Sequence, residues 1–222
     1  MDVLWGLALL WLAFGASHVG LSSLRLRPRL VDALGERVFL LGYSLIALAI
    51  FVPLASLYAT HRHEGAFLWF AAGIPGLREL AFAGMGVSFA LAVAGLLHPS
   101  PALMGSTTSD AAGVLRITRH PLFMGFGGMG LFHLLLVPVY LSDLLFLGGL
   151  PLFACLGCAH QDRRKLHDGG EDFRRFHSAT SFLPFGRPAG CLRGIREDAL
   201  PLGLGVLVAI GVRYLHPLLL SG

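Results

Sequence analysis

The chain has 222 residues, of which 55% are hydrophobic and only 14% are charged, with a formal net charge of +4 at pH 7. About a quarter of the residues of a soluble domain are usually charged, so a water-soluble globule of this length is excluded. The basic residues lie in short loops between long apolar runs. The sequence pI of about 9.3 therefore indicates a membrane surface and no nucleic-acid partner.

The apolar runs are about 20 residues long, the length that a helix needs to cross the hydrocarbon core. They lack the polar face of a helix in a soluble bundle. We predict an all-α fold: one integral membrane domain over residues 1–222, a multi-pass bundle of about six transmembrane helices. The predicted spans are residues 2–24, 38–58, 77–97, 121–139, 143–160 and 198–219. The first run has no basic segment before it, so we expect a spanning helix and not a signal peptide.

The loops between these spans differ sharply in charge. Four basic residues follow the first span, two lie between the third and fourth, and eight lie between the fifth and sixth, which is fourteen of the 17 Lys and Arg residues. If six spans alternate, all fourteen lie on one side, and the positive-inside rule places that side in the cytoplasm. We expect a bacterial inner-membrane protein with cytoplasmic basic loops and both termini outside.

Three segments outside the predicted spans have their own patterns. The segment "GAFLWFAAGIP" (65–75) is too short to span and predicts an interfacial helix, with Trp69 at the headgroup level. Residues 99–113 are rich in turn formers and predict a loop. In residues 169–188, the spacing of Phe173 and Phe176 predicts a short amphipathic helix on the cytoplasmic surface.

The chain has ten histidines, and most lie in predicted loops or at the ends of spans. For these, a solvated or interfacial imidazole is the simplest interpretation; they are His61, His63, His160, His167, His177 and His216. In "CLGCAH", Ala159 separates the second cysteine from the histidine, which argues against covalent haem attachment. We expect Cys155 and Cys158 to be small packing residues.

Two histidines lie at similar predicted depth. His18 lies near the cytoplasmic end of the first span, and His120 opens the fourth span, which enters the membrane from the same side. Polar residues inside a membrane usually face the bundle interior and often mark function. A hydrogen bond from His18 to a neighbouring helix is the alternative. Two imidazoles at matched depth favour a shared ligand, so we predict His18 and His120 as metal ligands.

The triplet Arg119, His120 and Pro121 adds to this prediction. Pro121 suits the first position of a helix, which places His120 at the positive end of the helix dipole and favours its neutral, metal-binding form. Arg116 and Arg119 are three residues apart, so in a helix they share a face that can hold a carboxylate or phosphate. An imidazole-bound iron, an apolar bundle and arginines for two propionates fit haem b.

His133 lies 13 residues after His120, about 20 Å along a straight helix. It cannot serve the same face of one haem as His120. His133 could replace His120 as the cofactor ligand or bond within the bundle. The glycines at positions 125, 127, 128 and 130 permit the close approach of a neighbouring helix or of a flat ligand.

Several segments, taken in order, resemble the motifs of the NnrU-like membrane protein family. They are "GASHVGLSS", "GERVFLLGYS", "GVLRITRHPLFMGF", "FHLLL", "QDRRKL" and "FRRFHSATSFLPF". The family includes bacterial proteins linked to denitrification and the plastid 15-cis-ζ-carotene isomerases. The resemblance implies haem b, with His18 and His120 at the positions of the haem histidines, and cis-trans isomerase or redox chemistry on an apolar substrate, or a role in nitrogen-oxide metabolism. Where the isomerases carry a cysteine implicated in ligand switching, this chain has Ile117.

A looser resemblance supplies a rival function. The segment "TRHPLFMGF", followed by a charged stretch and "FRRF", is similar to membrane methyltransferases that act on isoprenylcysteine or phospholipid. That resemblance implies S-adenosylmethionine as the cofactor, with Asp162 and Glu171 in place of a glutamate pair. A third alternative is a non-enzymatic assembly factor for a respiratory complex.

Overall fold

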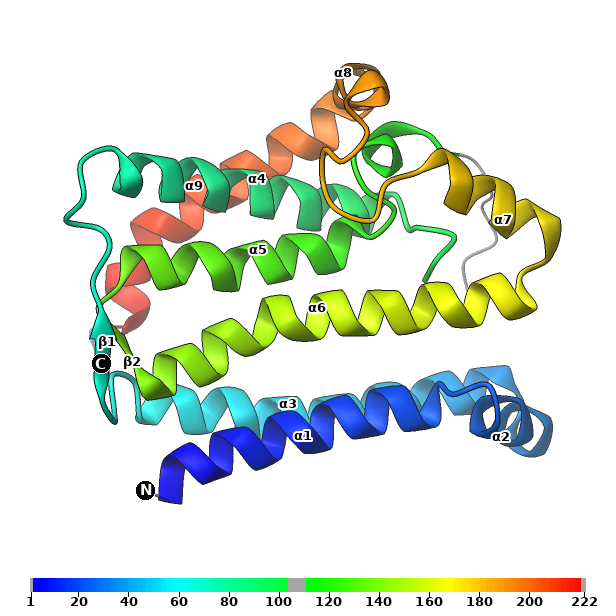
Figure 1. Cartoon of the computed structure of the whole chain (residues 1–222), viewed down its shortest axis with the longest axis horizontal. Coiled ribbons are helices and arrows are strands. Elements are labelled where there is room, and N and C mark those ends of the chain that lie inside the picture. Colours follow the sequence, from blue (N-terminus) through cyan, green and yellow to red (C-terminus); the bar gives the residue numbers. More distant parts are fainter. Residues whose placement is uncertain (1, 104–110, 221–222) are drawn as a thin grey trace.

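A computed structural model describes residues 2–103 and 111–220. In this part of the chain the fold is all-helical apart from a two-stranded ribbon (Figure 1). The elements are α1 (Asp2–Leu21), α2 (Leu26–Leu34), α3 (Glu36–Thr60), β1 (Phe67–Trp69), α4 (Leu77–Leu97), the 3-10 helix η1 (Gly113–Arg116), α5 (Pro121–Leu136), β2 (Val139–Tyr140), α6 (Leu141–Asp168), α7 (Gly170–Ala179), α8 (Pro188–Glu197) and α9 (Ala199–Leu220).

Five helices, α1, α3, α4, α6 and α9, are long and apolar enough to cross a membrane, so the chain is a multi-pass membrane protein. The helix α5 is also apolar but has only 16 residues. At about 1.5 Å per residue it covers about 24 Å of a hydrocarbon core about 30 Å thick. Figure 1 shows all six helices running between the same two ends of the molecule. A sixth crossing by α5 stays a prediction.

The long helices pack in two groups that meet at α6. Helix α4 packs against both α5 and α9, and α5 packs against α6. Helices α1 and α3 pair with each other and meet the rest of the bundle mainly through α6, so they form an outer layer (Figure 1). The cavity described below lies between this layer and α6.

Glycines in α5 allow this close packing. A Cβ atom on Gly125 would lie 2.6 Å from the backbone oxygen of Ser88 in α4, and one on Gly130 would overlap the backbone of Leu147 in α6. Real Cβ atoms do not approach backbone oxygens so closely, so these positions require glycine. At these two positions the glycine-rich run therefore serves contacts between helices.

The ribbon of β1 and β2 lies at the end of the bundle where α3 ends and α6 begins (Figure 1). The two strands are antiparallel, with Phe67 opposite Tyr140 and Trp69 opposite Val139. The predicted interfacial helix over residues 65–75 is therefore wrong. Val139 and Tyr140 form the partner strand, and β-branched and aromatic residues such as these favour strands. The aromatic segment that contains Phe67 and Trp69 therefore forms a strand when it pairs with them. The indole of Trp69 then donates to the backbone oxygen of Leu134 at 3.0 Å.

A buried carboxylate holds this ribbon end together. Asp143 is fully buried, and it accepts hydrogen bonds from the hydroxyl of Tyr58 at 3.0 Å and from the backbone N–H of Tyr140 at 2.8 Å. The ring Nδ1 of His63 lies 3.0 Å from the same carboxylate. A buried charge needs such donors. His63 is therefore a partner of Asp143, and its side chain stays 45% exposed, as the interpretation of a solvated residue expected.

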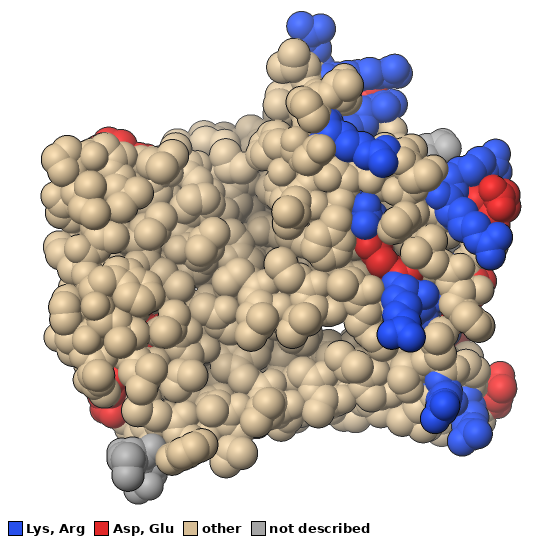
Figure 2. Space-filling model, viewed as in Figure 1, with Lys and Arg blue, Asp and Glu red and all other residues tan. Residues whose placement is uncertain are grey.

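The opposite end of the molecule carries α2, α7 and α8, and the Lys and Arg side chains on the face shown in Figure 2 gather there. We call it the basic end. Phe173 and Phe176 of α7 are buried in a cluster with Ala102 and Leu115. The predicted amphipathic helix is present, but its apolar face packs on the protein. In the predicted loop over residues 99–113, residues 104–110 lie outside the described part, and η1 begins at Gly113.

Candidate functional site

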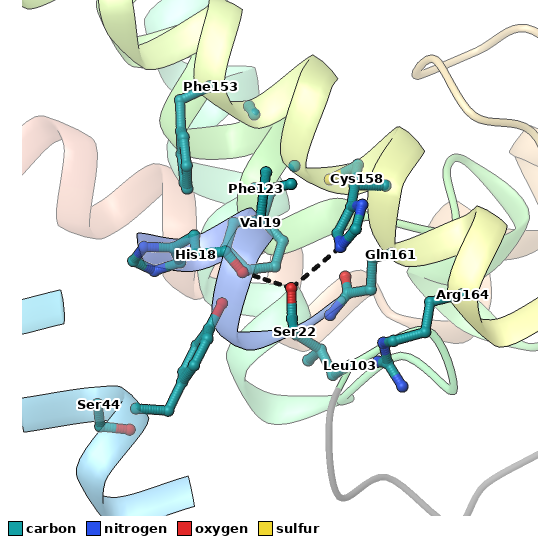
Figure 3. Close-up of a pocket in the computed structure, with 14 residues that line it drawn as sticks. His18, Val19, Ser22, Ser44, Leu103, Phe123, Phe153, Cys158, Gln161 and Arg164 are labelled. Atoms are coloured by element: carbon teal, nitrogen blue, oxygen red, sulfur yellow. Dashed lines mark hydrogen bonds between the residues drawn. The ribbon is translucent and has the colours of Figure 1, made fainter. Parts of the chain in front are cut away.

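A cavity of about 220 Å³ lies between α1, α3, α5 and α6 (Figure 3). Its residues from α1, His18 and Val19, belong to the last turn of that helix, on the side of the basic end. Phe123 and Phe153 line its apolar part. His18, His160 and Arg164 line its polar part. Aromatic walls with a few polar groups are typical of a small-molecule site.

His18 is held in one orientation within α1. Its ring Nδ1 lies 2.9 Å from the backbone oxygen of Phe14, one turn earlier. The rings of Phe14, Tyr43 and Phe153 surround it, with centroids 4.2, 5.0 and 5.1 Å from the imidazole centroid. Because a backbone oxygen only accepts, Nδ1 carries the hydrogen, and Nε2 keeps a lone pair. Metal-bound histidines are commonly oriented in this way, through a hydrogen bond from the other ring nitrogen.

His160 also belongs to the cavity wall. Its Nε2 lies 3.1 Å from the hydroxyl of Ser22, which itself donates to the backbone oxygen of His18 (Figure 3). The expectation of a solvated His160 is therefore wrong. Helix α6 continues to Asp168, well beyond the predicted end of the span at residue 160, so this imidazole lies within the helix. The helical spacing of Phe153, Gly157, His160 and Arg164 is the sequence signal that indicates one shared face.

His120 lies in a different environment, next to α6. It is 2% exposed, and its Nε2 lies 2.9 Å from one oxygen of Asp162, whose other oxygen accepts from the Nε of Arg119 at 2.7 Å. His120 is not among the residues that line the cavity. Asp162 follows the cavity residue Gln161, so it points about 100° further around the helix. His18 and His120 therefore lie next to neighbouring faces of α6 and do not meet in the cavity.

Arg116 and Arg119 do not form the predicted anion pocket. Helix η1 ends at Arg116, so the two side chains do not share a helical face. Arg119 is buried against Asp162, whereas Arg116 is half-buried and its Nε lies 2.9 Å from Glu197 of α8. Each guanidinium already has a carboxylate partner. The backbone N–H of Gly113, together with Arg116, lowers the pKa of Glu197 from 4.5 to about 2.

His133 lies away from the cavity, in the last turn of α5. Its Nδ1 lies 3.0 Å from the backbone oxygen of Met129, and its ring centroid is 6.3 Å from that of His216 in α9. His133 was predicted either to bind the cofactor or to bond within the bundle, and in the structure it bonds within the bundle. Ile117 is buried with Leu91 and Val114.

Two polar residues of the basic segment behave differently from each other. His167 is exposed, as expected, and lies next to Asp168. His177 is half-buried, with its Nε2 3.7 Å from Asp162, and this burial lowers its pKa.

Glu171, the predicted partner of Asp162 in a methyltransferase site, has a side chain 73% exposed and lies near Arg174. The structure therefore does not bring Asp162 and Glu171 together.

Sequence reasoning also missed Arg164, which lines the cavity. It is 4% exposed, and its Nε and Nη2 atoms have no hydrogen-bond partner within the described part of the chain. In the sequence it lies in the run "QDRRKL", where nothing distinguishes it from Arg163. Only the helical register of α6 separates the two, since Arg163 is exposed on another face.

The fold and the cavity together define a polytopic helical membrane protein with a histidine-bearing, aromatic-walled site. The chain belongs to the NnrU protein family, whose model matches residues 6–221. It is 30% identical over 226 residues to "15-cis-zeta-carotene isomerase, chloroplastic" of Arabidopsis thaliana, and 28% identical over 225 residues to the protein of the same name from Zea mays. Both alignments cover 95% of this chain but 59% of the relative, so the chain spans about three fifths of these curated relatives. No solved structure matches the chain.

Proposed function

We propose that this protein binds haem b in the cavity, with His18 as an iron ligand, and performs redox or cis-trans isomerase chemistry on an apolar membrane substrate. One observation carries the proposal: the Phe14 backbone oxygen fixes Nδ1 of His18 and leaves Nε2 available as a metal-binding nitrogen. Haem would supply a redox-active iron in an apolar environment. The protein's own residues would orient the imidazole, enclose the macrocycle and exclude water.

The residues that line the cavity fit this group chemically. They provide the imidazole of His18, flat aromatic walls at Phe123 and Phe153, and a buried guanidinium at Arg164. The volume of about 220 Å³ is below the roughly 300–1,000 Å³ usual for ligand pockets. Haem binding would therefore require the layer of α1 and α3 to move away from α6. Because α1 and α3 contact the bundle mainly through α6, such a movement leaves the packing of α4, α5 and α9 unchanged.

His120 stays our candidate for the second iron ligand. A carboxylate on one ring nitrogen is the usual means of orienting a metal-bound histidine, and Asp162 provides one for His120. The cavity does not include His120, so His18 is the ligand that the geometry favours more strongly. Separate substitutions of the two histidines distinguish one-ligand from two-ligand binding.

The similarity to two carotene isomerases supports an isomerase-type reaction on a long apolar molecule. The resemblance to NnrU-like proteins that are linked to denitrification motivates the alternative of a haem-linked role in nitrogen-oxide metabolism. We further propose that the basic end faces the cytoplasm, since fourteen of the 17 Lys and Arg residues lie in the loops assigned to that end.

The test is an absorption spectrum of the detergent-solubilised protein, supplied with haem during expression, before and after reduction with dithionite. The wild type is expected to show a Soret band that shifts on reduction, and His18→Ala is expected to lose it. His133→Ala is the matched control and should keep the band, since His133 lies outside the cavity. A shifted spectrum in His120→Ala would support a second ligand. Wild-type protein that stays colourless with added haem would contradict the proposal.

The same preparation tests the alternatives. A methyltransferase would retain S-adenosylmethionine and stay colourless, and an assembly factor would bind neither cofactor. The positions of Asp162 and Glu171 give the methyltransferase no support, because Asp162 is bound to His120 and Arg119 and Glu171 is exposed.

A further inference from the structure

We propose that Arg164 forms an anion-binding site in the cavity and takes the carboxylate of an amphiphilic acid whose apolar body lies against Phe123 and Phe153. The identity of this acid rests on the proposed function. If that function is right, the acid is haem b and the carboxylate is one of its propionates. A long-chain fatty acid offers the same chemistry, a carboxylate on an apolar body.

The first argument is the unsatisfied state of Arg164. The residue is 4% exposed, and neither Nε nor Nη2 has a hydrogen-bond partner among the described residues. A buried charge is costly unless it is paired and hydrogen-bonded. Nε and Nη2 lie on the same edge of the guanidinium, and their N–H bonds are parallel. This edge forms the two-bond fork that matches a carboxylate.

The second argument is an excess of positive charge around Arg164. Arg27 and Lys165 both lie close enough to repel it electrostatically. Glu36 pairs with Arg27 at 3.1 Å, and the Nε of Arg27 is likewise buried without a partner among the described residues. Asp168 attracts Arg164, but its side chain is 44% exposed and lies 2.6 Å from His167. An additional anion at Arg164 would reduce the mutual repulsion of these cations.

The third argument is the division of the cavity into a polar and an apolar part. Arg164, Gln161 and Ser22 lie together in the close-up, with the guanidinium and the amide at the same end (Figure 3). Phe153 lies further along α6, with Gly157 between it and the polar residues. A molecule that fills both parts has an acidic head and an apolar body. Arg164 therefore takes the role of binding a carboxylate, which the sequence suggested for Arg116 and Arg119.

The first experiment compares haemin with haemin dimethyl ester, in which both propionates are blocked, by titration of the purified protein. Arg164→Gln is expected to weaken haemin binding about tenfold or more, the effect of losing hydrogen bonds to a charged group. It should leave binding of the dimethyl ester unchanged. Arg163→Gln is the matched control, since Arg163 is the exposed neighbour on α6, and it should bind haemin as the wild type does.

The second experiment does not depend on haem. It measures binding of cis-parinaric acid and of its methyl ester by fluorescence. The wild type should prefer the acid, and Arg164→Gln should abolish that preference. A preference for the acid that depends on Arg164, in a protein that does not bind haemin, would support the anion site and refute the haem proposal. Haemin binding that is equal for acid and ester, with no effect of Arg164→Gln in either experiment, would overturn the anion site and leave the proposed function intact.

The apo protein provides a check on folding. Because Arg164→Gln removes a buried charge without a described partner, the variant should have a melting temperature no lower than that of the wild type. If it nevertheless fails to fold, Arg164→Lys keeps the charge and removes the two-bond fork. Arg164→Lys is then expected to lower the ratio of acid to ester affinity, and an unchanged ratio would overturn the proposal.

Discussion

The Nε2 atom of His120 lies 2.9 Å from the carboxylate of Asp162, across the contact between the start of α5 and the last part of α6. The second oxygen of Asp162 accepts from Arg119, so one buried carboxylate connects two consecutive residues of the chain to another helix. The Arg-His-Pro triplet is therefore an anchor of α5 to α6, whatever further part its histidine takes in ligand binding.

Asp162→Asn is expected to destabilise the protein. The substitution keeps the shape of the side chain but leaves the buried guanidinium of Arg119 without a counter-charge. Removing one partner of a buried ion pair costs about 3–5 kcal/mol. Thermal unfolding in detergent measures the effect. Asp172→Asn is the matched control, because Asp172 and Arg175 form an exposed pair on α7, which should contribute little. Equal melting temperatures for the two variants would contradict the anchoring role of Asp162.

Glu197 predicts a pH dependence at the basic end. Its pKa in the folded protein is about 2, lowered from 4.5 by the N–H of Gly113 and by Arg116 and Arg193. Since the folded pKa lies below the unfolded one, the stabilising contribution is complete above about pH 5 and is lost as the pH falls towards 2. Glu197→Gln should therefore be less stable than the wild type at pH 6. The difference between the two proteins should shrink steadily between about pH 4.5 and 2 in acid-unfolding experiments. A difference that does not change with pH would show that the charge of Glu197 is unimportant.

Gly125→Ala tests the close packing of α4 and α5. The added Cβ would lie 2.6 Å from the backbone oxygen of Ser88, so a helix backbone must shift. Overpacking of this kind typically costs about 1–3 kcal/mol. Gly42→Ala in α3 is the control, since a Cβ there meets nothing within 4 Å and alanine favours the helix. We expect a lower melting temperature for Gly125→Ala and an equal or higher one for Gly42→Ala.

Gly157→Leu tests the cavity itself. Gly157 lines the cavity, and a Cβ there would make only ordinary contacts with Phe153, so the larger side chain can fill the space without displacing backbone. Haemin binding should fall about tenfold or more, whereas the melting temperature should stay the same or rise as apolar surface is buried. Gly211→Leu, on the exposed surface of α9, should change neither property. Unchanged haemin affinity in Gly157→Leu would place the haem elsewhere.

The architecture could be predicted largely from the sequence because it depends on long apolar runs. Residues 38–58 and 77–97 fall within or coincide with α3 and α4, and the basic loops follow the first, third and fifth predicted spans. The ribbon could not be predicted, since its strand at residues 67–69 depends on a partner more than sixty residues away. The end of α6 was misplaced because hydropathy falls after residue 160 although the helix continues to Asp168.

The candidate site was predicted in part. His18 was singled out by its depth in an apolar span, and it does line the cavity. Arg116 was chosen by its spacing from Arg119, but its partner is Glu197 on a distant segment, and such pairing leaves no local pattern. Arg164 was missed for the opposite reason: in a run of basic residues, only burial distinguishes the one that faces inward.

The polar cluster around Asp143 has a mechanical consequence for the layer of α1 and α3. Tyr58 at the end of α3 is bonded to Asp143 at the start of α6, so these two helices are fastened where the ribbon lies. Towards the basic end, the half-buried bond between Ser22 and His160 crosses the same interface. A ligand that enters between α1 and α6 would break this bond. The layer of α1 and α3 would then separate from α6 towards the basic end and stay joined to it at Asp143.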